Sequence, residues 1–468
     1  MDALRELTAE VRAHCSAPLE LSIKGTVLYP DDPGYDAART PWNLSFEQHP
    51  ELIVIPRDAD DIAAAVCYAL EEELNVAVQA TGHGVRRPAD DALLIVTSEM
   101  TGVEVDPETQ TAWVEAGAKW AHVLEAAQAH GLAPLLGSSP DVGAVGYTLG
   151  GGLGWLARKY GLAADSAPAF DVVTADGRQL RVSEHEHPDL FWGLRGGGGS
   201  LAIVARMQIR LYPVDTVYAG NLLYPVEMAG DVMSRYRDWI TTLPDEMTTS
   251  IVLLNVPPLP TMPEPLRGKS FAVVRGCYTG DLAAGAALID DWRAWRAPAI
   301  DMFGPLSFSQ SAMISQDPED PSPAVVSGAW LRELDDATLE TLMNFTVPQG
   351  GPPLIVMTEV RHIGGAVSRG DVGRAAYGNR DAELLLELVS ITPTPEIGAA
   401  AHAHIAAMKA ALGPAIRGAY MNFLEGEEAH ERLAEGFSPE TLQRLRALKA
   451  AWDPENRFCH SFRIDPLP

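Results

Sequence analysis

The first 213 residues alternate apolar runs of strand length with segments of helical spacing. Residues 61–74 and 119–131 carry apolar side chains every three to four positions, which predicts two amphipathic helices. Apolar runs bounded by turn residues predict strands between and after them. These strands lie within 51–60, 75–84, 92–100, 111–118, 169–176, 178–183 and 200–213.

The pattern changes after Pro213. From residue 214 to about 392, strands alternate with helices, which favours one antiparallel sheet covered by helices, an α+β arrangement. The predicted strands lie within 217–226, 248–256, 270–280, 353–366 and 384–391, and the predicted helices within 229–243, 282–295, 336–345, 395–412 and 438–452. Two proline-rich segments, 256–265 and 315–323, are predicted as surface loops.

Composition and charge exclude several classes of protein. The 468 residues include 35 Lys and Arg against 63 Asp and Glu, a formal net charge of −28, and 47% hydrophobic residues. This composition excludes a disordered or collagen-like chain, and the length suggests two or three domains that each bury a core. The negative charge argues against a nucleic acid or an anionic membrane surface as partner.

We expect a cytoplasmic protein without a metal site. Residues 1–15 predict an amphipathic helix without the apolar core of a signal peptide, and no uncharged apolar stretch reaches membrane-spanning length. The four cysteines, Cys15, Cys67, Cys277 and Cys459, are far apart and form no CxxC pair. A disulfide framework is therefore not expected.

Two clusters of glycines mark a candidate ligand site. They are Gly82–Gly84 and the segment 137–154, which holds seven glycines and no lysine, so backbone N–H groups are expected to hold an anion there. His83 lies between two glycines at the end of a predicted strand, where an imidazole is a nucleophile, a base, a cofactor tether or only a core hydrogen-bonder. Gly152–Ala157 matches a dinucleotide fingerprint, but a glycine-rich loop precedes it instead of a strand, so we set it aside.

Five segments in order resemble one family of flavoproteins. They are VAVQATGHG, GSSPDVGAVGYTLGGGLGWLARKYGLAAD, VVTADG, DLFWGLRGGGGSLAIV and the C-terminal AYMNF with DPENRFCHSFRIDP. Together they are similar to the berberine-bridge-enzyme-like FAD-linked oxidases of the vanillyl-alcohol oxidase superfamily. The resemblance implies a PCMH-type FAD-binding domain over 1–213, a substrate domain over 214–414, and a segment 415–468 that completes the FAD domain.

The resemblance also implies which residues bind FAD. Thr81, Gly82, His83, Gly84, Val85, Ser139, Asp141, Val142, Gly143, Gly146, Tyr147, Gly150, Gly152, Val204 and Asn422 match its cofactor positions. His83 matches the histidine that bonds covalently to the flavin 8α-methyl group. Ser139 stands where bicovalent members carry a cysteine, and a serine oxygen cannot form that thioether, so a single attachment through His83 is implied.

The catalytic base is the point where the sequence departs from the family. Many members read Tyr-x-Asn-Tyr near the C-terminus, and the second tyrosine is the base, whereas this sequence has Phe423 there, in Tyr420-Met421-Asn422-Phe423. Substitutes are expected on the middle-domain sheet, and the candidates are Glu359, Arg361, His362, Tyr377, Arg380, Glu387 and Tyr420. Strand alternation puts Glu359 and Arg361 on one face. As a base, Glu359 is expected to have a pKa of about 5 to 7, which suits neutral-pH catalysis.

The implied reaction is oxidation of an alcohol, or of a similar C–H bond, by hydride transfer to flavin N5, with O2 as the acceptor. The implied substrate is a small molecule, either a sugar or a secondary metabolite. Two alternatives stay open: a flavin dehydrogenase with another electron acceptor, and an FAD-binding cyclase or isomerase without net redox chemistry.

Overall fold

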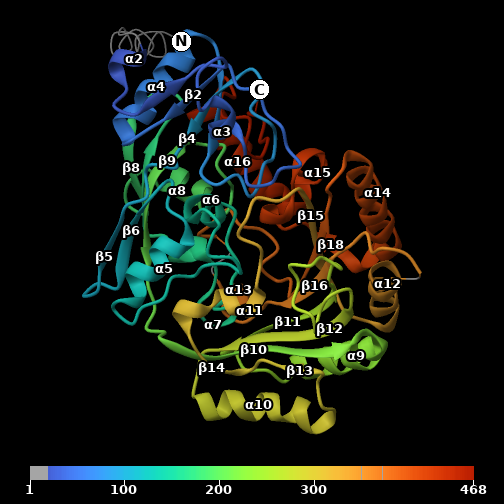
Figure 1. The fold of residues 1–468 in the computed structure, drawn as a ribbon. Helices are drawn as coiled ribbons and strands as arrows, with labels where there is room; N and C mark the ends of the chain where they lie inside the picture. The colour runs from blue at the N-terminus through green and yellow to red at the C-terminus, as the bar shows by residue number, and fades with distance from the viewer. Residues whose placement is uncertain (1–18, 349, 371–372, 468) are drawn as a thin grey trace.

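The computed structural model describes residues 19–348, 350–370 and 373–467, so the helix predicted at residues 1–15 lies outside the described part. Three sheets with helices packed on them make up the fold (Figure 1). The first sheet has four strands in the order β1-β2-β4-β3. They are β1 Thr26–Leu28, β2 Leu52–Ile55, β3 Asn75–Gln79 and β4 Ala92–Val96, with α3 Tyr35–Arg39 and α4 Ala59–Glu71 packed against them.

The second sheet has five antiparallel strands in the order β5-β6-β9-β7-β8. They are β5 Val103–Asp106, β6 Thr111–Glu115, β7 Ala169–Val173, β8 Gln179–Ser183 and β9 Ile203–Arg210, accompanied by α5 Trp120–Gln128, α6 Ala144–Leu149 and α8 Pro188–Leu194. The glycine-rich segment 137–154 follows α5, contains α6 and leads into the four-residue helix α7, Ala157–Tyr160. A loop and a single helical turn therefore stand where the dinucleotide fingerprint requires a strand and a helix.

The third sheet has nine strands and every pair in it is antiparallel, as predicted for the middle of the chain. Its order is β13-β10-β12-β11-β16-β17-β15-β18, with β14 also paired to β10. The strands are β10 Thr216–Pro225, β11 Met247–Asn255, β12 Ser270–Tyr278, β13 Ile300–Asp301, β14 Gly304–Ser307, β15 Ala324–Leu331, β16 Met357–His362, β17 Leu384–Ile391 and β18 Ile416–Gly418. The sequence pattern did not predict β13, β14, β15 or β18.

The large sheet presents different side chains on its two faces because successive residues of a strand point to opposite sides. On one face, Leu222, Val274 and Leu386 join the core formed with the covering helices. These helices are α9 Ala229–Ile240, α10 Leu282–Trp295, α12 Asp336–Thr346 and α14 Pro395–Leu412 (Figure 1). On the other face, the neighbouring residues Arg275 and Glu387 point into a cavity. One face of the sheet thus packs in the hydrophobic core, and the other face lines the cavity.

The C-terminal helix α16, Pro439–Trp452, ties the end of the chain to the first two sheets. Lys449 is fully buried and donates through Nζ to Asp453 at 2.6 Å and to the carbonyl oxygen of Ser200 at 2.7 Å. The Asp453 carboxylate also accepts the backbone N–H groups of Arg457 and Phe458. This buried ion pair holds the residues after α16 in place.

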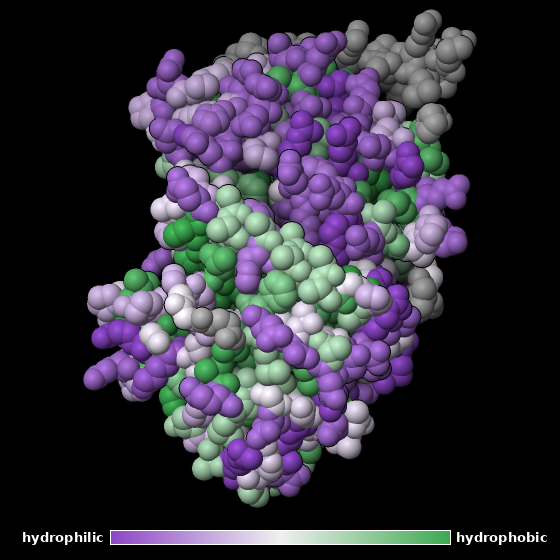
Figure 2. Space-filling model, turned by 90° about the vertical axis from the view of Figure 1, so that its right-hand side faces the viewer, coloured by the Kyte–Doolittle hydropathy of each residue, from purple (hydrophilic) through white to green (hydrophobic). Residues whose placement is uncertain are grey.

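Figure 2 looks onto the side of the molecule that carries α12 and α14. Apolar residues gather across the middle of this face, where α14 exposes several alanines, and the upper part is mainly hydrophilic. Within the described ranges, no helix is both long enough and apolar enough to cross a membrane.

Candidate active site

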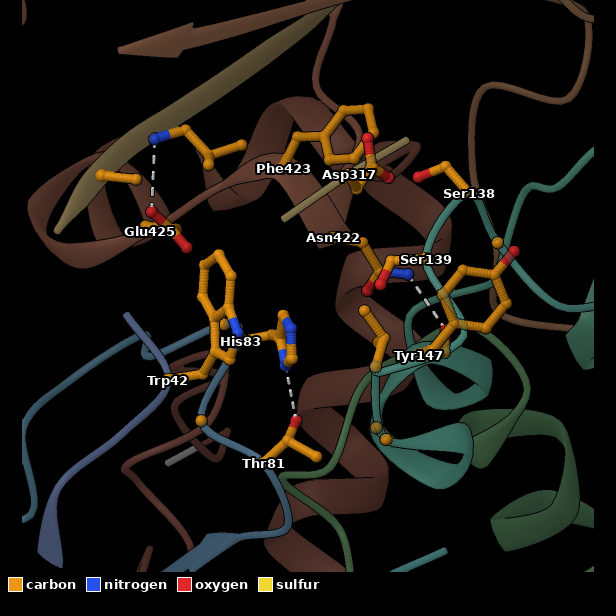
Figure 3. A pocket seen from close by; sticks show the side chains of 18 of the residues that line it. Trp42, Thr81, His83, Ser138, Ser139, Tyr147, Asp317, Asn422, Phe423 and Glu425 are labelled. Carbon is orange, nitrogen blue, oxygen red and sulfur yellow. Dashed lines mark hydrogen bonds between the residues drawn. The ribbon is translucent and has the colours of Figure 1, made fainter. Parts of the chain in front are cut away.

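A cavity of about 860 Å³ lies between the first two sheets and the open face of the large sheet. Its walls include the end of β3 with the loop after it, the glycine-rich segment, the start of β9, the large sheet and the C-terminal segment. Trp42, the loop between β11 and β12 and the loop before β15 also line it. Residues that are hundreds of positions apart in the sequence therefore share one space. Figure 3 shows Trp42 and His83 on one wall and Ser139, Tyr147 and Asn422 on the opposite one.

His83 is held at the cavity wall by its neighbours. Its ring stacks on Trp42 with centroids 4.4 Å apart, and its Nδ1 shares a hydrogen bond of 2.8 Å with Thr81 Oγ1 (Figure 3). Gly82 makes this turn possible, since its φ is +75° and a Cβ there would lie 2.8 Å from the backbone N of Trp42. The loop after β3 therefore makes the glycine turn that the sequence predicts.

The other ring nitrogen of His83 is available for chemistry. Nε2 is buried and has no hydrogen-bond partner among the described residues, and the nearest carboxylate oxygen, Asp141 Oδ2, is 3.8 Å away. Burial lowers the pKa of His83 to about 4, although Asp141 opposes the shift. The imidazole is therefore neutral at pH 7, which is the form with a free lone pair.

The glycine-rich segment forms the wall that faces His83. Ser139, Val142, Gly143, Gly146 and Tyr147 line the cavity. A Cβ at Gly146 would meet no atom within 4 Å, so the missing side chain leaves open space there. The Tyr147 hydroxyl is buried without a partner among the described residues. An open cradle with unpartnered polar atoms fits a large polar ligand.

The other expected cofactor residues divide into lining and supporting positions. Thr81, Gly82, Gly84, Val85, Val204 and Asn422 also line the cavity. Asp141 does not, and instead pairs with Lys119. Gly150 and Gly152 do not line it either, because Asn422 and the Tyr147 ring occupy the positions that their side chains would take. These two glycines allow close packing behind the wall.

Arg86 is a cavity cation that the sequence analysis missed. Its guanidinium lines the cavity 4.7 Å above the Phe462 ring, and Nη1 is buried without a hydrogen-bond partner in the described chain. Burial lowers its pKa to about 10, so Arg86 is still charged at pH 7. The expectation that backbone donors alone would hold an anion is therefore incomplete. The sequence feature that could have indicated this role is the position of Arg86, three residues after His83 and just beyond the glycine turn.

The structure separates Glu359 from the cavity. Glu359 and Arg361 do share one face of β16, as predicted, and Arg361 Nε donates to Glu359 Oε2 at 2.9 Å. However, Glu359 is fully buried, accepts hydrogen bonds from Ser250 at 2.5 Å and Arg275 at 3.5 Å, and does not line the cavity. Burial would raise the pKa of Glu359, but Arg361 and Arg275 outweigh it and hold the pKa well below its ordinary value. The expected pKa of about 5 to 7 is therefore wrong.

Of the two paired glutamates, Glu387 is the one that lines the cavity. It lies directly opposite Glu359 on the neighbouring strand β17, lines the cavity and pairs with Arg361. Burial raises the pKa of Glu387, Arg361 lowers it and the nearby Glu359 raises it again, with a net upward shift. The Arg361 guanidinium, which pairs with Glu387, lies 5.2 Å from the ring centroid of Phe423.

The two candidate tyrosines are poor bases. Tyr420 lines the cavity, and its hydroxyl accepts hydrogen bonds from Leu153 N and Asn422 Nδ2, both at 3.1 Å. Burial raises the pKa of Tyr420 to about 12. Tyr377 lies outside the cavity lining, and burial raises its pKa well above the ordinary value. Both phenols therefore hold their protons at neutral pH.

Comparisons with known proteins agree with this geometry. The model of an FAD binding domain matches residues 50–183, and a model described as berberine and berberine like matches residues 419–464. (R)-6-hydroxynicotine oxidase of Paenarthrobacter nicotinovorans is 28% identical over 95% of this chain and 98% of its own length. The crystal structure of 6-hydroxy-D-nicotine oxidase from Arthrobacter nicotinovorans has a TM-score of 0.83, 26% identity, and coverage of 97% of this chain and 100% of that one. Glucooligosaccharide oxidase from Acremonium strictum has a TM-score of 0.81 at 22% identity, covering 98% and 99%.

Proposed function

Because this chain belongs to the berberine-bridge-enzyme-like FAD-linked oxidoreductases, we propose that it oxidises an alcohol, or a similar C–H bond, of a small molecule and passes the electrons to O2. The observation that carries this proposal is one cavity with a glycine-lined cofactor wall facing an ionisable wall of the large sheet. FAD supplies the hydride acceptor, at its N5 atom, when it is bound. The protein supplies position, charge and a base.

The cofactor wall fits FAD with a single attachment. The open space beside Gly146 and the unpartnered guanidinium of Arg86 suit a dinucleotide with an anionic pyrophosphate. His83 would form the bond to the 8α carbon. Glucooligosaccharide oxidase from Acremonium strictum carries a 6-S-cysteinyl, 8α-N1-histidyl FAD. Here Ser139 lines the wall, and none of Cys67, Cys277 and Cys459, the cysteines within the described residues, lines the cavity, which supports attachment through His83 alone.

Glu387 takes the role of base in this proposal, in place of Glu359. It is the carboxyl group of the pair that reaches the cavity, and its raised pKa makes its ionised form a stronger proton acceptor than an ordinary carboxylate. Arg361 lies between Glu387 and Glu359 and keeps both carboxyl groups in position. Phe423 supplies an apolar cover where many relatives place a phenol.

The test compares Glu387→Gln with the parent and with Glu383→Gln, an exposed carboxyl outside the cavity lining on the same stretch of chain. The probes are 4-phenylbutan-1-ol and 4-phenylbutylamine, and the readout is anaerobic flavin reduction followed by peroxide release in air. Loss of the base should slow reduction by about 10²–10⁴-fold in Glu387→Gln with FAD still bound. Flavin that stays oxidised with every alcohol and amine tried would refute the oxidation. Reduced flavin that recovers only with an artificial acceptor would make the enzyme a dehydrogenase.

A further inference from the structure

We propose that the substrate is a lipophilic cation, whose apolar body lies against the loop between β11 and β12 and whose charged head meets Asp317. This inference rests on the function proposed above and narrows it, because a sugar and a lipophilic amine need opposite walls. Three features of the cavity carry it: an apolar wall, the carboxyl group of Asp317 without a direct partner among the described residues, and the backbone ties of the loop that bears it.

The wall away from the flavin side is apolar. The loop 256–269 contributes six side chains to the cavity, Val256, Pro257, Leu259, Met262, Pro263 and Leu266, and every one of them is apolar. Leu223 and Val273 from the sheet beneath join Val256 in one hydrophobic cluster. A sugar carries a hydroxyl on nearly every carbon, and those hydroxyls would lose water here without gaining a partner. An aliphatic or aromatic body gains contact instead.

At the sheet end of the cavity, one carboxyl group has no direct hydrogen-bond or ion-pair partner among the described residues. Arg275 and Arg361 lie here beside the carboxyl groups of Glu359, Glu387 and Asp317. A further carboxyl group of the cavity, Glu425, accepts a hydrogen bond from the backbone N–H of Val326 in β15. Glu359 binds both arginines and Glu387 binds Arg361. Asp317 makes no hydrogen bond or ion pair within 4 Å in the described part of the chain, and through space it raises the pKa of both Glu387 and Arg361. A positive charge on a substrate could therefore pair directly with Asp317.

Asp317 is positioned by the same segment that supports His83. It lies in the loop between α11 Ala312–Ser315 and β15, and lines the cavity with Phe423 and Ser315 (Figure 3). Trp42, which stacks on His83, donates through Nε1 to the carbonyl oxygen of Glu319 at 2.9 Å. The backbone N–H of Ser322 donates to the carbonyl oxygen of Trp42, and the N–H of Leu44 donates to the carbonyl oxygen of Ser322, which adds a second tie. The loop that bears Asp317 is therefore tied to the segment around Trp42.

The experiment measures binding and not turnover. The flavin-loaded enzyme is titrated anaerobically with 4-phenylbutylamine, 4-phenylbutan-1-ol and cellobiose, and the change in the flavin absorption spectrum gives each Kd. We expect the amine to bind at least about tenfold more tightly than the alcohol at pH 7.5, and cellobiose to give no change at millimolar concentration. Asp317→Asn should weaken amine binding about tenfold and leave the alcohol unchanged.

Two further variants keep the result interpretable. Asp320→Asn, an exposed carboxyl in the same loop that does not line the cavity, should leave all three titrations as in the parent. Met262→Gln should weaken amine and alcohol alike, because both place their body on that wall. An amine-to-alcohol ratio unchanged in Asp317→Asn, or cellobiose binding as tightly as the amine, would overturn the inference. An amine that binds as expected but never reduces the flavin would count against the proposed oxidation and leave this inference standing.

Discussion

The neutral His83 imidazole predicts how flavin attachment depends on pH. Attachment needs a ring nitrogen with a free lone pair, which the protonated ring lacks. With the pKa lowered by burial to about 4, the neutral fraction is essentially complete at pH 7.5. By the ordinary titration relation it is still about 97% at pH 5.5. An unperturbed histidine would instead fall about tenfold over the same interval, from about 91% to about 9% neutral.

The assay starts from apoprotein made under riboflavin limitation. FAD is added at pH 5.5 and pH 7.5, samples are precipitated with acid over time, and flavin fluorescence is read in the pellet. We expect attachment rates that agree within about a factor of two. His83→Ala should leave no flavin in the pellet, and Asp141→Asn should keep the parent's flat profile, because losing this carboxylate lowers the pKa of His83 further.

The confounding variable is FAD binding itself. Quenching of FAD fluorescence by His83→Ala apoprotein gives the non-covalent Kd at both pH values, and rates are compared at saturation. A tenfold slower attachment at pH 5.5 under saturation would show that the imidazole titrates normally. Burial would then not control the pKa of this ring, even if His83 is the attachment site.

Two other predictions concern buried charges. Arg86→Met is made in the His83→Ala background so that FAD binding is reversible, and it should weaken FAD binding about tenfold or more. The control is Arg57→Met, at a distant exposed arginine, which should leave the Kd of FAD unchanged. Equal Kd values for the two variants would remove Arg86 from the cofactor site. Lys449→Met leaves the Asp453 carboxylate buried without its cation. The free energy of unfolding, measured by urea titration, should fall by about 3–5 kcal/mol. A loss below about 1 kcal/mol would contradict the buried ion pair.

Most of the large sheet could be predicted because its strands keep a clear hydrophobic pattern. The strand β15 was missed for physical reasons. It follows a proline-rich segment, seven of its eight residues are buried, and it contains Gly328. That glycine is required, since a Cβ there would lie 2.7 Å from the Phe423 Cβ. Because both faces of β15 are buried, its apolar and polar residues do not alternate as they do in a half-exposed strand. The sequence also does not show that Phe423 packs against Gly328.

The site could be predicted where its residues lie close together in the sequence. The loop around His83 and the segment 137–154 form the expected wall, because local backbone preferences place them. The pairing of Glu359 with Glu387 depends on which strands become neighbours, and this separates the buried carboxylate from the one in the cavity. Likewise, segments 256–265 and 315–323 were predicted as surface loops, and Leu259 is indeed 52% exposed, but both also line the cavity.

The contribution of the last fifty residues to the cavity has a consequence for synthesis of the protein. Asn422 and Phe462 line the same space as His83, and α16 with its buried lysine holds the final segment against the first sheets. A growing chain therefore exposes His83 long before the opposite wall exists. The pocket can close around a cofactor only after residues 422–462 have left the ribosome. Flavin should thus enter late, and chains that stop before residue 422 should emerge colourless.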